Sequence, residues 1–416
     1  MLIPQESRIP LQDKFFDLFP TVDLHVPEER HLLRNMESLI VTRGCKTNQA
    51  LAKSQPTGTD RSCLSRHFAG KWSAAELLEA GRETWLTLWD KENAAAQGNR
   101  VVYHIIDDTA NPHSPAKTCR PWERSARSME AVDQHYDHNT GQTVPAHSVV
   151  TSHVVYGLHS VPWKHDVYRR KDDCARAGIF FRSKIDIACD FITTFQAPVG
   201  TERVFHLMDA WYMNRRLIEA ARDREGDVLI GALSFKTRLE RGPHGLGEMR
   251  LSALPRALKS DDLDTVIVKG KRYEFWRYEG GLFGQPDMAV VIVREKGKTA
   301  WTAIACTDSA LSSETIIGHY LVRWEIETGH WYLKCALGFG DYRLRSLDAI
   351  KHFWCEVILT YWYLEWLRHE RRLPNLAEAQ RVFIKDYERR YVIYLWQLFS
   401  QHKTIDDVQA ALHIAA

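Results

Sequence analysis

The chain has 416 residues, of which 44% are hydrophobic and 26% charged, and its formal net charge is +2. This length allows two or three domains with buried cores, and the composition excludes a mainly disordered chain. The near-neutral charge excludes a uniformly basic nucleic-acid coat, although local basic patches remain compatible with it. The eight cysteines form no C-x-x-C pair, which favours free thiols over a zinc knuckle or a disulfide framework.

The first residues, MLIPQESRIP, lack a basic segment followed by an apolar core, so no signal peptide is expected. The most apolar run, residues 353–367, carries Glu356 and Glu365 and is too short and too charged to span a bilayer. We therefore interpret it as a buried helix and expect a cytoplasmic protein.

Residues 1–95 are expected to form a helical domain, because apolar residues recur at helical spacing in 31–41 and 73–88. Between these segments, residues 50–52 and 60–68 flank a Pro-Thr-Gly-Thr break, a pattern compatible with a helix-turn-helix. The second helix would offer basic side chains to DNA, namely Arg61, Arg66 and His67. Helix pairs of this kind also occur in all-α subdomains that bind no DNA, so both interpretations stay open.

At Arg100 the pattern changes to a β-branched run that ends in Asp107, Asp108 and Thr109. Such a run predicts a buried strand that brings carboxylates to its end. A later apolar strand, starting at Arg203, ends in Asp209 in the same way. The fold class predicted from the alternation of elements is α/β, a mixed sheet covered by helices. The further strands and helices are expected at about 146–157, 160–168, 179–195, 213–223 and 227–233.

Residues 231–305 differ from what precedes them, because glycine-rich turns separate β-like runs. This pattern predicts a β-rich insertion. After it we expect helices at 312–336 and 347–369, and a helical tail over 375–416.

Four chemically distinctive residues, Tyr320, Arg323, Glu327 and Lys334, are separated by steps of 3, 4 and 7. In an α-helix these steps bring the four side chains to nearly one azimuth. A carboxylate flanked by a phenol, a guanidinium and an ammonium suits a site where the acid holds a cation and the bases hold phosphate oxygens. The alternative is a surface helix with an Arg–Glu pair at i, i+4.

Three acidic positions therefore stand out: Asp107 or Asp108, Asp209 and Glu327. A helix laid against the sheet edge where two strands end could bring the third acid to the other two. Three such carboxylates can hold two divalent cations, and Mg²⁺ prefers oxygen ligands. The cations would also offset the mutual repulsion of the acids.

At these positions the chain resembles bacterial insertion-sequence transposases with an RNase H-like DDE core and a Tyr-Arg-Glu-Lys signature, Y-x2-R-x3-E-x6-K. The resemblance assigns Asp107 as the first acid, with Asp108 as the alternative. Asp209, followed by Ala-Trp-Tyr, fits the second acid. In some members a tryptophan at the end of the insertion stacks on a flipped base, and Trp301 is similarly placed.

The resemblance implies five regions. They are a DNA-binding helical domain (1–95), an RNase H-like core in two parts (96–230 and 306–372), the β-rich insertion (231–305) and a helical C-terminal region (373–416).

The implied function is a DNA transposase that binds terminal inverted repeats as a homodimer, cleaves the ends and transfers them to target DNA. Asp107, Asp209 and Glu327 would hold two Mg²⁺ ions, with Mn²⁺ as a substitute. Lys334 would contact the DNA phosphates together with Tyr320 and Arg323. Two alternatives stay open: an RNase H-like nuclease without strand transfer, and a domesticated DNA-binding protein with an inactive core.

Overall fold

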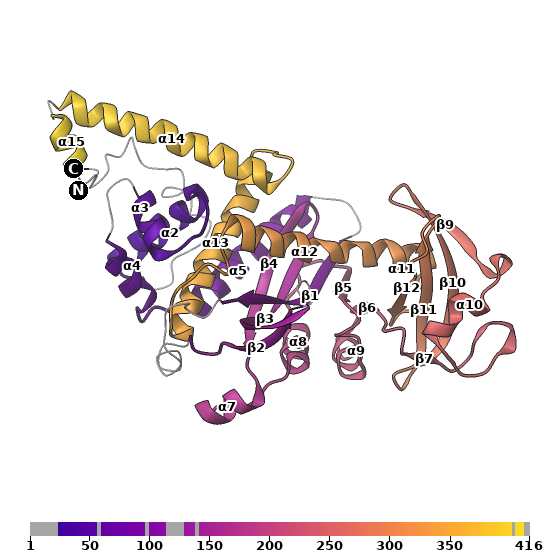
Figure 1. Ribbon diagram of the computed structural model, residues 1–416. Helices are drawn as coiled ribbons and strands as arrows, with labels where there is room; N and C mark the ends of the chain where they lie inside the picture. The colour runs from indigo at the N-terminus through magenta and orange to yellow at the C-terminus, as the bar shows by residue number, and fades with distance from the viewer. Residues whose placement is uncertain are drawn as a thin grey trace. The chain divides into compact units, whose positions relative to one another are not determined.

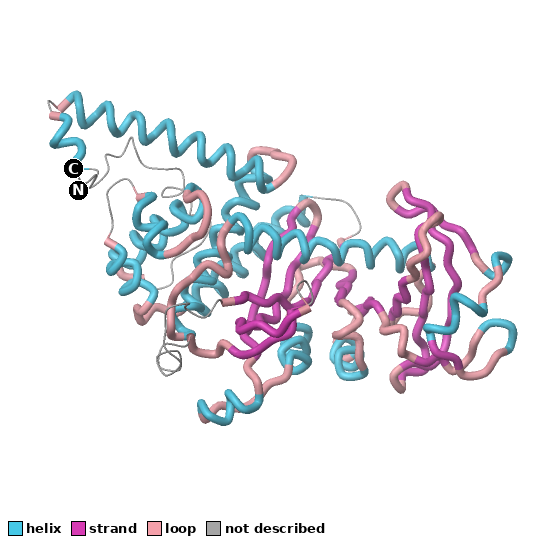
Figure 2. The backbone as a smooth tube through the Cα atoms, viewed as in Figure 1, coloured by secondary structure: helices cyan, strands magenta, loops and turns pink. Residues whose placement is uncertain are grey.

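The computed structural model describes residues 24–55, 60–95, 100–113, 129–137, 141–401 and 404–411 (Figures 1 and 2). The chain forms two compact units, each built from separate stretches of sequence. The first unit comprises Met1–Trp89, Asn111–His147 and His330–Ala416. The second comprises Asp90–Ala110 and Ser148–Gly329. None of the helices within the described ranges is long and apolar enough to cross a bilayer.

The first unit is mainly helical. Its core is α13 (Leu347–Glu370), which is buried over most of its length, as its apolar sequence predicted. Helices α2 and α4 pack against α13, and so does α14. The other elements of this unit are α3, the greater part of α5, α15 and strand β2. The bounds are Val26–Val41 (α2), Asn48–Ser54 (α3), Arg61–Phe68 (α4), Ala74–Ala95 (α5), Asp133–Asp137 (β2), Leu376–Ser400 (α14) and Ile405–Ala411 (α15).

Helices α3 and α4 occupy the segments predicted as a helix-turn-helix, and residues 56–59 between them lie outside the described residues. Arg61 and Arg66 of α4 are exposed. The expectation that His67 is offered to DNA is wrong, because His67 is buried and its Nε2 lies 2.6 Å from Oε1 of the buried Glu356. His67 belongs to the core because a buried carboxylate on α13 needs a hydrogen-bond partner.

The sheet contains ten strands in the order β2–β3–β1–β5–β6–β12–β11–β10–β9, with β4 also paired to β3. Strands β1, β5 and β6 are parallel, whereas β12, β11, β10 and β9 alternate in direction. This mixed sheet with flanking helices confirms the predicted α/β fold and is consistent with an RNase H-like domain. The bounds are Val101–Pro112 (β1), Gln142–Tyr156 (β3), His159–Tyr168 (β4), Arg203–Met208 (β5), Val228–Ala232 (β6), Asp264–Val268 (β9), Lys271–Leu282 (β10), Gln285–Glu295 (β11) and Thr302–Cys306 (β12).

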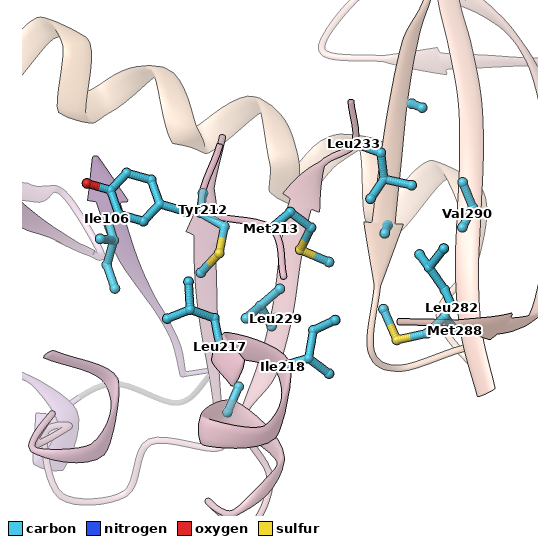
Figure 3. Close-up of a cluster of buried hydrophobic side chains, with 14 of the residues drawn as sticks. Ile106, Tyr212, Met213, Leu217, Ile218, Leu229, Leu233, Leu282, Met288 and Val290 are labelled. Atoms are coloured by element: carbon cyan, nitrogen blue, oxygen red, sulfur yellow. The ribbon is translucent and has the colours of Figure 1, made fainter. Parts of the chain in front are cut away.

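Two buried clusters cover the two faces of the sheet in the second unit. On one face, α8 (Lys184–Thr193) and α9 (Arg215–Arg222) pack on β1, β5 and β6, and their cluster continues into β10 and β11 (Figure 3). On the other face, α11 (Ser313–Tyr320) and α12 (Trp324–Trp331) contribute Ile316, Ile317 and Ile326. Residues 231–305, which were predicted as a β-rich insertion, therefore share their core with the rest of the sheet.

Several elements differ from the expected ones. The helix predicted over 179–195 begins only at Lys184, because Ser183 forms a capping box with Asp186 that ends the extended chain there. The helix predicted over 312–336 is broken into α11, a 3₁₀ turn (Leu321–Arg323), α12 and a π-helical turn (Tyr332–Ala336). The elements that were not predicted are β2, α7 (Lys171–Ala177), β7 (Arg238–Leu239), β8 (Met249–Arg250) and α10 (Leu254–Ala257), with three short 3₁₀ turns (Pro243–Gly245, Leu251–Ala253 and Ser260–Asp262).

Candidate active site

Asp107 and Asp209 come from neighbouring parallel strands. The last paired residues of β1 and β5 are Ile106 and Met208, so the two aspartates follow at the same level of the sheet. Burial and the charge of Asp209 raise the pKa of Asp107 to about 7. Burial also raises the pKa of Asp209, against the stabilising effect of the Tyr212 and Trp211 backbone N–H groups that donate to its Oδ1 at 3.2 Å and 2.9 Å.

Glu327 lies on α12 and is connected to Asp107 through Arg323. The Arg323 guanidinium donates from Nη2 to Glu327 Oε1 at 2.5 Å, and its Nη1 lies 3.7 Å from Asp107 Oδ2. The Tyr320 ring lies beside the same guanidinium, 5.8 Å from centroid to carbon. Arg323 therefore stands between two of the three predicted acids and partly neutralises both.

Three contacts fix the rotation of α12 about its axis. Ile326 is buried in the cluster under the helix. Ser160 of β4 donates to Glu325 Oε2 at 3.1 Å. Gly329 packs so closely on β3 that a Cβ there would lie 2.7 Å from the His153 ring. Since Glu325 and Gly329 share one face of the helix, Glu327 is left on another face, with Arg323.

Asp108 is engaged differently from Asp107. Its Oδ2 lies 2.6 Å from Lys184 Nζ, and the Tyr212 hydroxyl donates to its Oδ1 at 3.0 Å. Tyr212 is fully buried, and that burial, together with the charge of Asp108, raises its pKa well above the usual range. Sequence reasoning missed both partners, because Lys184 is 76 residues from Asp108 and belongs to a helix that only folding brings to the strand.

The remaining predicted residues are Trp301 and Lys334. Trp301 precedes β12, packs against the core cluster of the second unit, and has the Arg294 guanidinium 4.5 Å above its ring. Lys334 lies in the π-helical turn, which belongs to the first unit. The site therefore contains Asp107, Asp108, Asp209, Tyr320 and Arg323 with Glu327, all from the second unit.

The donor set of this site suits a hard divalent cation. Its candidate ligands are carboxylate oxygens, which Mg²⁺ prefers. The raised pKa of Asp107 reflects a crowded group of acids with little solvent, and a cation would relieve that repulsion. Asp107, Asp209 and Glu327 would supply the ligands.

Comparison with known families gives a match over part of the chain. Residues 182–363 match the family described as Transposase DDE domain. The matched segment is less than half of the chain and runs from the start of α8 into α13, so it contains Asp209, Arg323 and Glu327 but not Asp107. No curated protein matches the chain. The predicted resemblance to DDE transposases is thereby supported over residues 182–363, and that family implies a divalent metal.

Proposed function

We propose that this protein is a DNA transposase of the bacterial insertion-sequence type. It would bind terminal inverted repeats as a homodimer, cleave the transposon ends and transfer them to target DNA. The observation that carries the proposal is the grouping of Asp107 and Asp209 on neighbouring strands with Glu327 linked through Arg323, within a chain whose central segment matches a transposase DDE domain.

In the proposed mechanism, Asp107, Asp209 and Glu327 hold the divalent cations, two Mg²⁺ ions or Mn²⁺ in their place. Divalent cations held there would supply activation of the attacking hydroxyl and stabilisation of the charge on the leaving oxygen. Asp107 would have to release a proton to act as a ligand, because its raised pKa leaves it partly protonated near neutrality. No side chain need act as nucleophile or general base.

Two groups of the signature, Arg323 and Tyr320, bind the scissile phosphate. Arg323 exchanges part of its contact with Glu327 and Asp107 for the phosphate oxygens, since a guanidinium can bind both kinds of anion bidentately. Tyr320 adds a hydroxyl to this contact, and Lys334 is proposed to contact the DNA backbone through its ammonium. Trp301 stacks on an unpaired base, a contact that aromatic side chains provide in enzymes that extrude bases.

Asp107 is proposed as the metal ligand in preference to Asp108. Asp108 already accepts from Lys184 and Tyr212, so its charge is balanced without a cation. Asp107 lies beside Arg323, and the negative charge of Asp209 repels its own. The N-terminal helices up to residue 95 are proposed to bind DNA through Arg61 and Arg66, both exposed on α4.

The decisive experiment compares Glu327→Ala with wild type on a plasmid carrying the gene and its native flanking DNA. We expect Mg²⁺-dependent cleavage at the element ends to be lost while DNA binding is retained. Glu314→Ala removes an exposed carboxylate of α11 and serves as the matched control, with cleavage unchanged. Unaltered cleavage by Glu327→Ala would overturn the assignment.

Strand transfer needs a separate test, because a nuclease of the same fold would also cleave. Pre-cut ends carrying a free 3′-hydroxyl are incubated with the wild-type protein, a target plasmid and Mg²⁺. Joined products are expected from a transposase, and cleavage without joining would favour the nuclease alternative. Absence of both would favour the domesticated DNA-binding protein.

A further inference from the structure

One end of the β-rich insertion carries an unusual concentration of exposed basic side chains. They lie on the turn between β9 and β10, at the start of β10, and on the turn that follows β11. We call this group the basic rim, and it consists of Lys269, Lys271, Arg272, Lys296 and Lys298, all exposed.

Acidic residues balance only part of this charge. Glu295 pairs with Lys298 at 2.8 Å and with Lys271 at 3.5 Å, while Glu274 pairs with Arg294 and lies 3.8 Å from Lys296. Among the described residues, Lys269 and Arg272 have no carboxylate partner. The rim therefore keeps a net positive charge, although the chain as a whole is almost neutral.

Strand directions place the rim at the same end of the sheet as the candidate active site. Asp209 directly follows the carboxyl end of β5, and Asp107 lies at the same level of the neighbouring parallel strand β1, which continues to Pro112. Strand β6 runs parallel to both. Since β12, β11, β10 and β9 alternate in direction, the turn after β9 and the turn before β12 lie at that end too. The opposite end of the insertion carries the turn between β10 and β11.

Packing supports the same placement independently. Val268, the last residue of β9, shares a buried cluster with Ile316, Ile317 and Tyr320. A Cβ on Gly318 would lie 3.7 Å from the Val268 side chain. The tip of the β9–β10 hairpin is thus held beside α11, the helix that ends at Tyr320 (Figure 1).

The spacing of the strands also gives the approximate distance between Asp209 and the basic rim. Four inter-strand steps lead from β5, which carries Asp209, to β10. At about 4.8 Å a step they span about 19 Å. Along B-DNA, with a rise of about 3.4 Å per base pair, this distance corresponds to about six base pairs.

We infer that the basic rim binds the sugar–phosphate backbone of duplex DNA about six base pairs from the phosphate that is cut. The inference rests on the proposed function, because the carboxylate site defines where the cut lies. Lysine and arginine contacts of this kind fix the register of a duplex without reading its sequence. The partner is therefore double-stranded DNA of any sequence at this position.

The first test uses the double variant Lys269→Glu/Arg272→Glu of the full chain and a 40-base-pair duplex, with binding followed by fluorescence anisotropy over a salt series. We expect about tenfold weaker binding and a log–log salt slope less steep by about 2, because two phosphate contacts are removed. Lys171→Glu/Lys259→Glu is the matched control. Both control lysines are exposed; Lys171 starts α7, and Lys259 precedes the opposite end of β9. An unchanged slope in the rim variant would overturn the inference.

The second test needs no variant, so misfolding cannot affect it. Wild-type protein is acetylated with and without the duplex, and the modified lysines are located by mass spectrometry. DNA should protect Lys269, Lys271, Lys296 and Lys298 severalfold, while Lys171 and Lys259 react equally in both samples. Equal modification of the four rim lysines would overturn the inference.

The two proposals fail in different ways. If wild type cleaves DNA and Glu327→Ala does not, while the rim variant retains the salt slope and the rim lysines stay reactive, the inference fails and the proposed function stands. If Glu327→Ala cleaves like wild type, the proposed function fails. The part of the inference that places the rim about six base pairs from the cut then fails as well.

Discussion

Asp107 and Asp209 lie at the same level on neighbouring parallel strands, because each directly follows the register pair Ile106 and Met208. The sheet therefore forces two carboxylates together in a partly buried place. Burial and mutual repulsion both disfavour the ionised forms, and the pKa of Asp107 rises to about 7 as a result. In the absence of a cation, this arrangement lowers the stability of the folded protein. A divalent cation bound by the two carboxylates would offset that loss.

Asp107→Asn measures how much stability the ionised Asp107 removes from the folded protein. The pKa of Asp107 is about 7 in the folded protein, against a reference value of 3.8. Between these two pH values the folded protein keeps a proton on Asp107 that the unfolded chain has lost. The free energy of unfolding therefore falls as the pH rises through this range. At pH 8 without divalent ions, the substitution should raise the free energy of unfolding by on the order of 2 kcal/mol. The gain should disappear as the pH falls towards 4. Urea denaturation at several pH values checks this, and an equal gain at every pH would contradict it.

Cation binding should be coupled to proton release at the same residue. Below pH 7 the cation must displace the proton of Asp107, so affinity for Mg²⁺ or Mn²⁺ should rise up to about tenfold per pH unit between 5 and 7 and level off above. Calorimetry at pH 6 in two buffers with different ionisation enthalpies measures the protons released. The Asp107→Asn variant should release fewer, and an affinity that does not change with pH would contradict the assignment.

Asp108 and Lys184 should behave as a coupled pair. Lys184→Met leaves a carboxylate of limited exposure without its cation, and Asp108→Asn leaves the ammonium without its acid, so each should lower stability. The double variant should lose less than the sum of the two, with a coupling energy of about 1 kcal/mol or more. Thermal or urea unfolding of the four proteins gives this energy. Strict additivity would show that the 2.6 Å contact contributes nothing.

Gly329 offers a way to disturb Glu327 from the other face of its helix. In Gly329→Ala the new methyl group would meet the His153 ring at 2.7 Å, so α12 must shift or His153 must move, at a cost of about 1–3 kcal/mol. Cleavage should fall at least tenfold while DNA binding is kept. His153→Ala in the same chain opens space for the methyl group and should restore part of the cleavage. Full activity of Gly329→Ala would show that the helix position is not critical.

Much of this site could be predicted from the sequence, because its key residues sit where local patterns are strong. The apolar runs before Asp107 and Asp209 predict both strands, and Asp209 does follow the end of β5, whereas β1 continues past Asp107 to Pro112. The spacing of Tyr320, Arg323 and Glu327 predicts that these side chains share a helical face, and Arg323 does contact both Tyr320 and Glu327. These inferences need only strand direction and helical period.

The features that escaped prediction depend on contacts between distant residues. Nothing near Asp108 in the sequence indicates that Lys184 and Tyr212 hold it. Likewise, the sequence around His67 suggests a surface residue on a short helix, but His67 is buried and forms a hydrogen bond with Glu356 of α13. The 3₁₀ and π turns on either side of α12 are not revealed by helical periodicity either.

The position of Arg323 has a consequence for how the protein is made. The Arg323 guanidinium donates to Glu327 at 2.5 Å and lies 3.7 Å from Asp107. Its positive charge therefore offsets part of the negative charge of these two acids without a bound cation. Folding of the sheet should then not depend on a bound divalent cation. The protein should accordingly stay folded during purification in a chelating buffer.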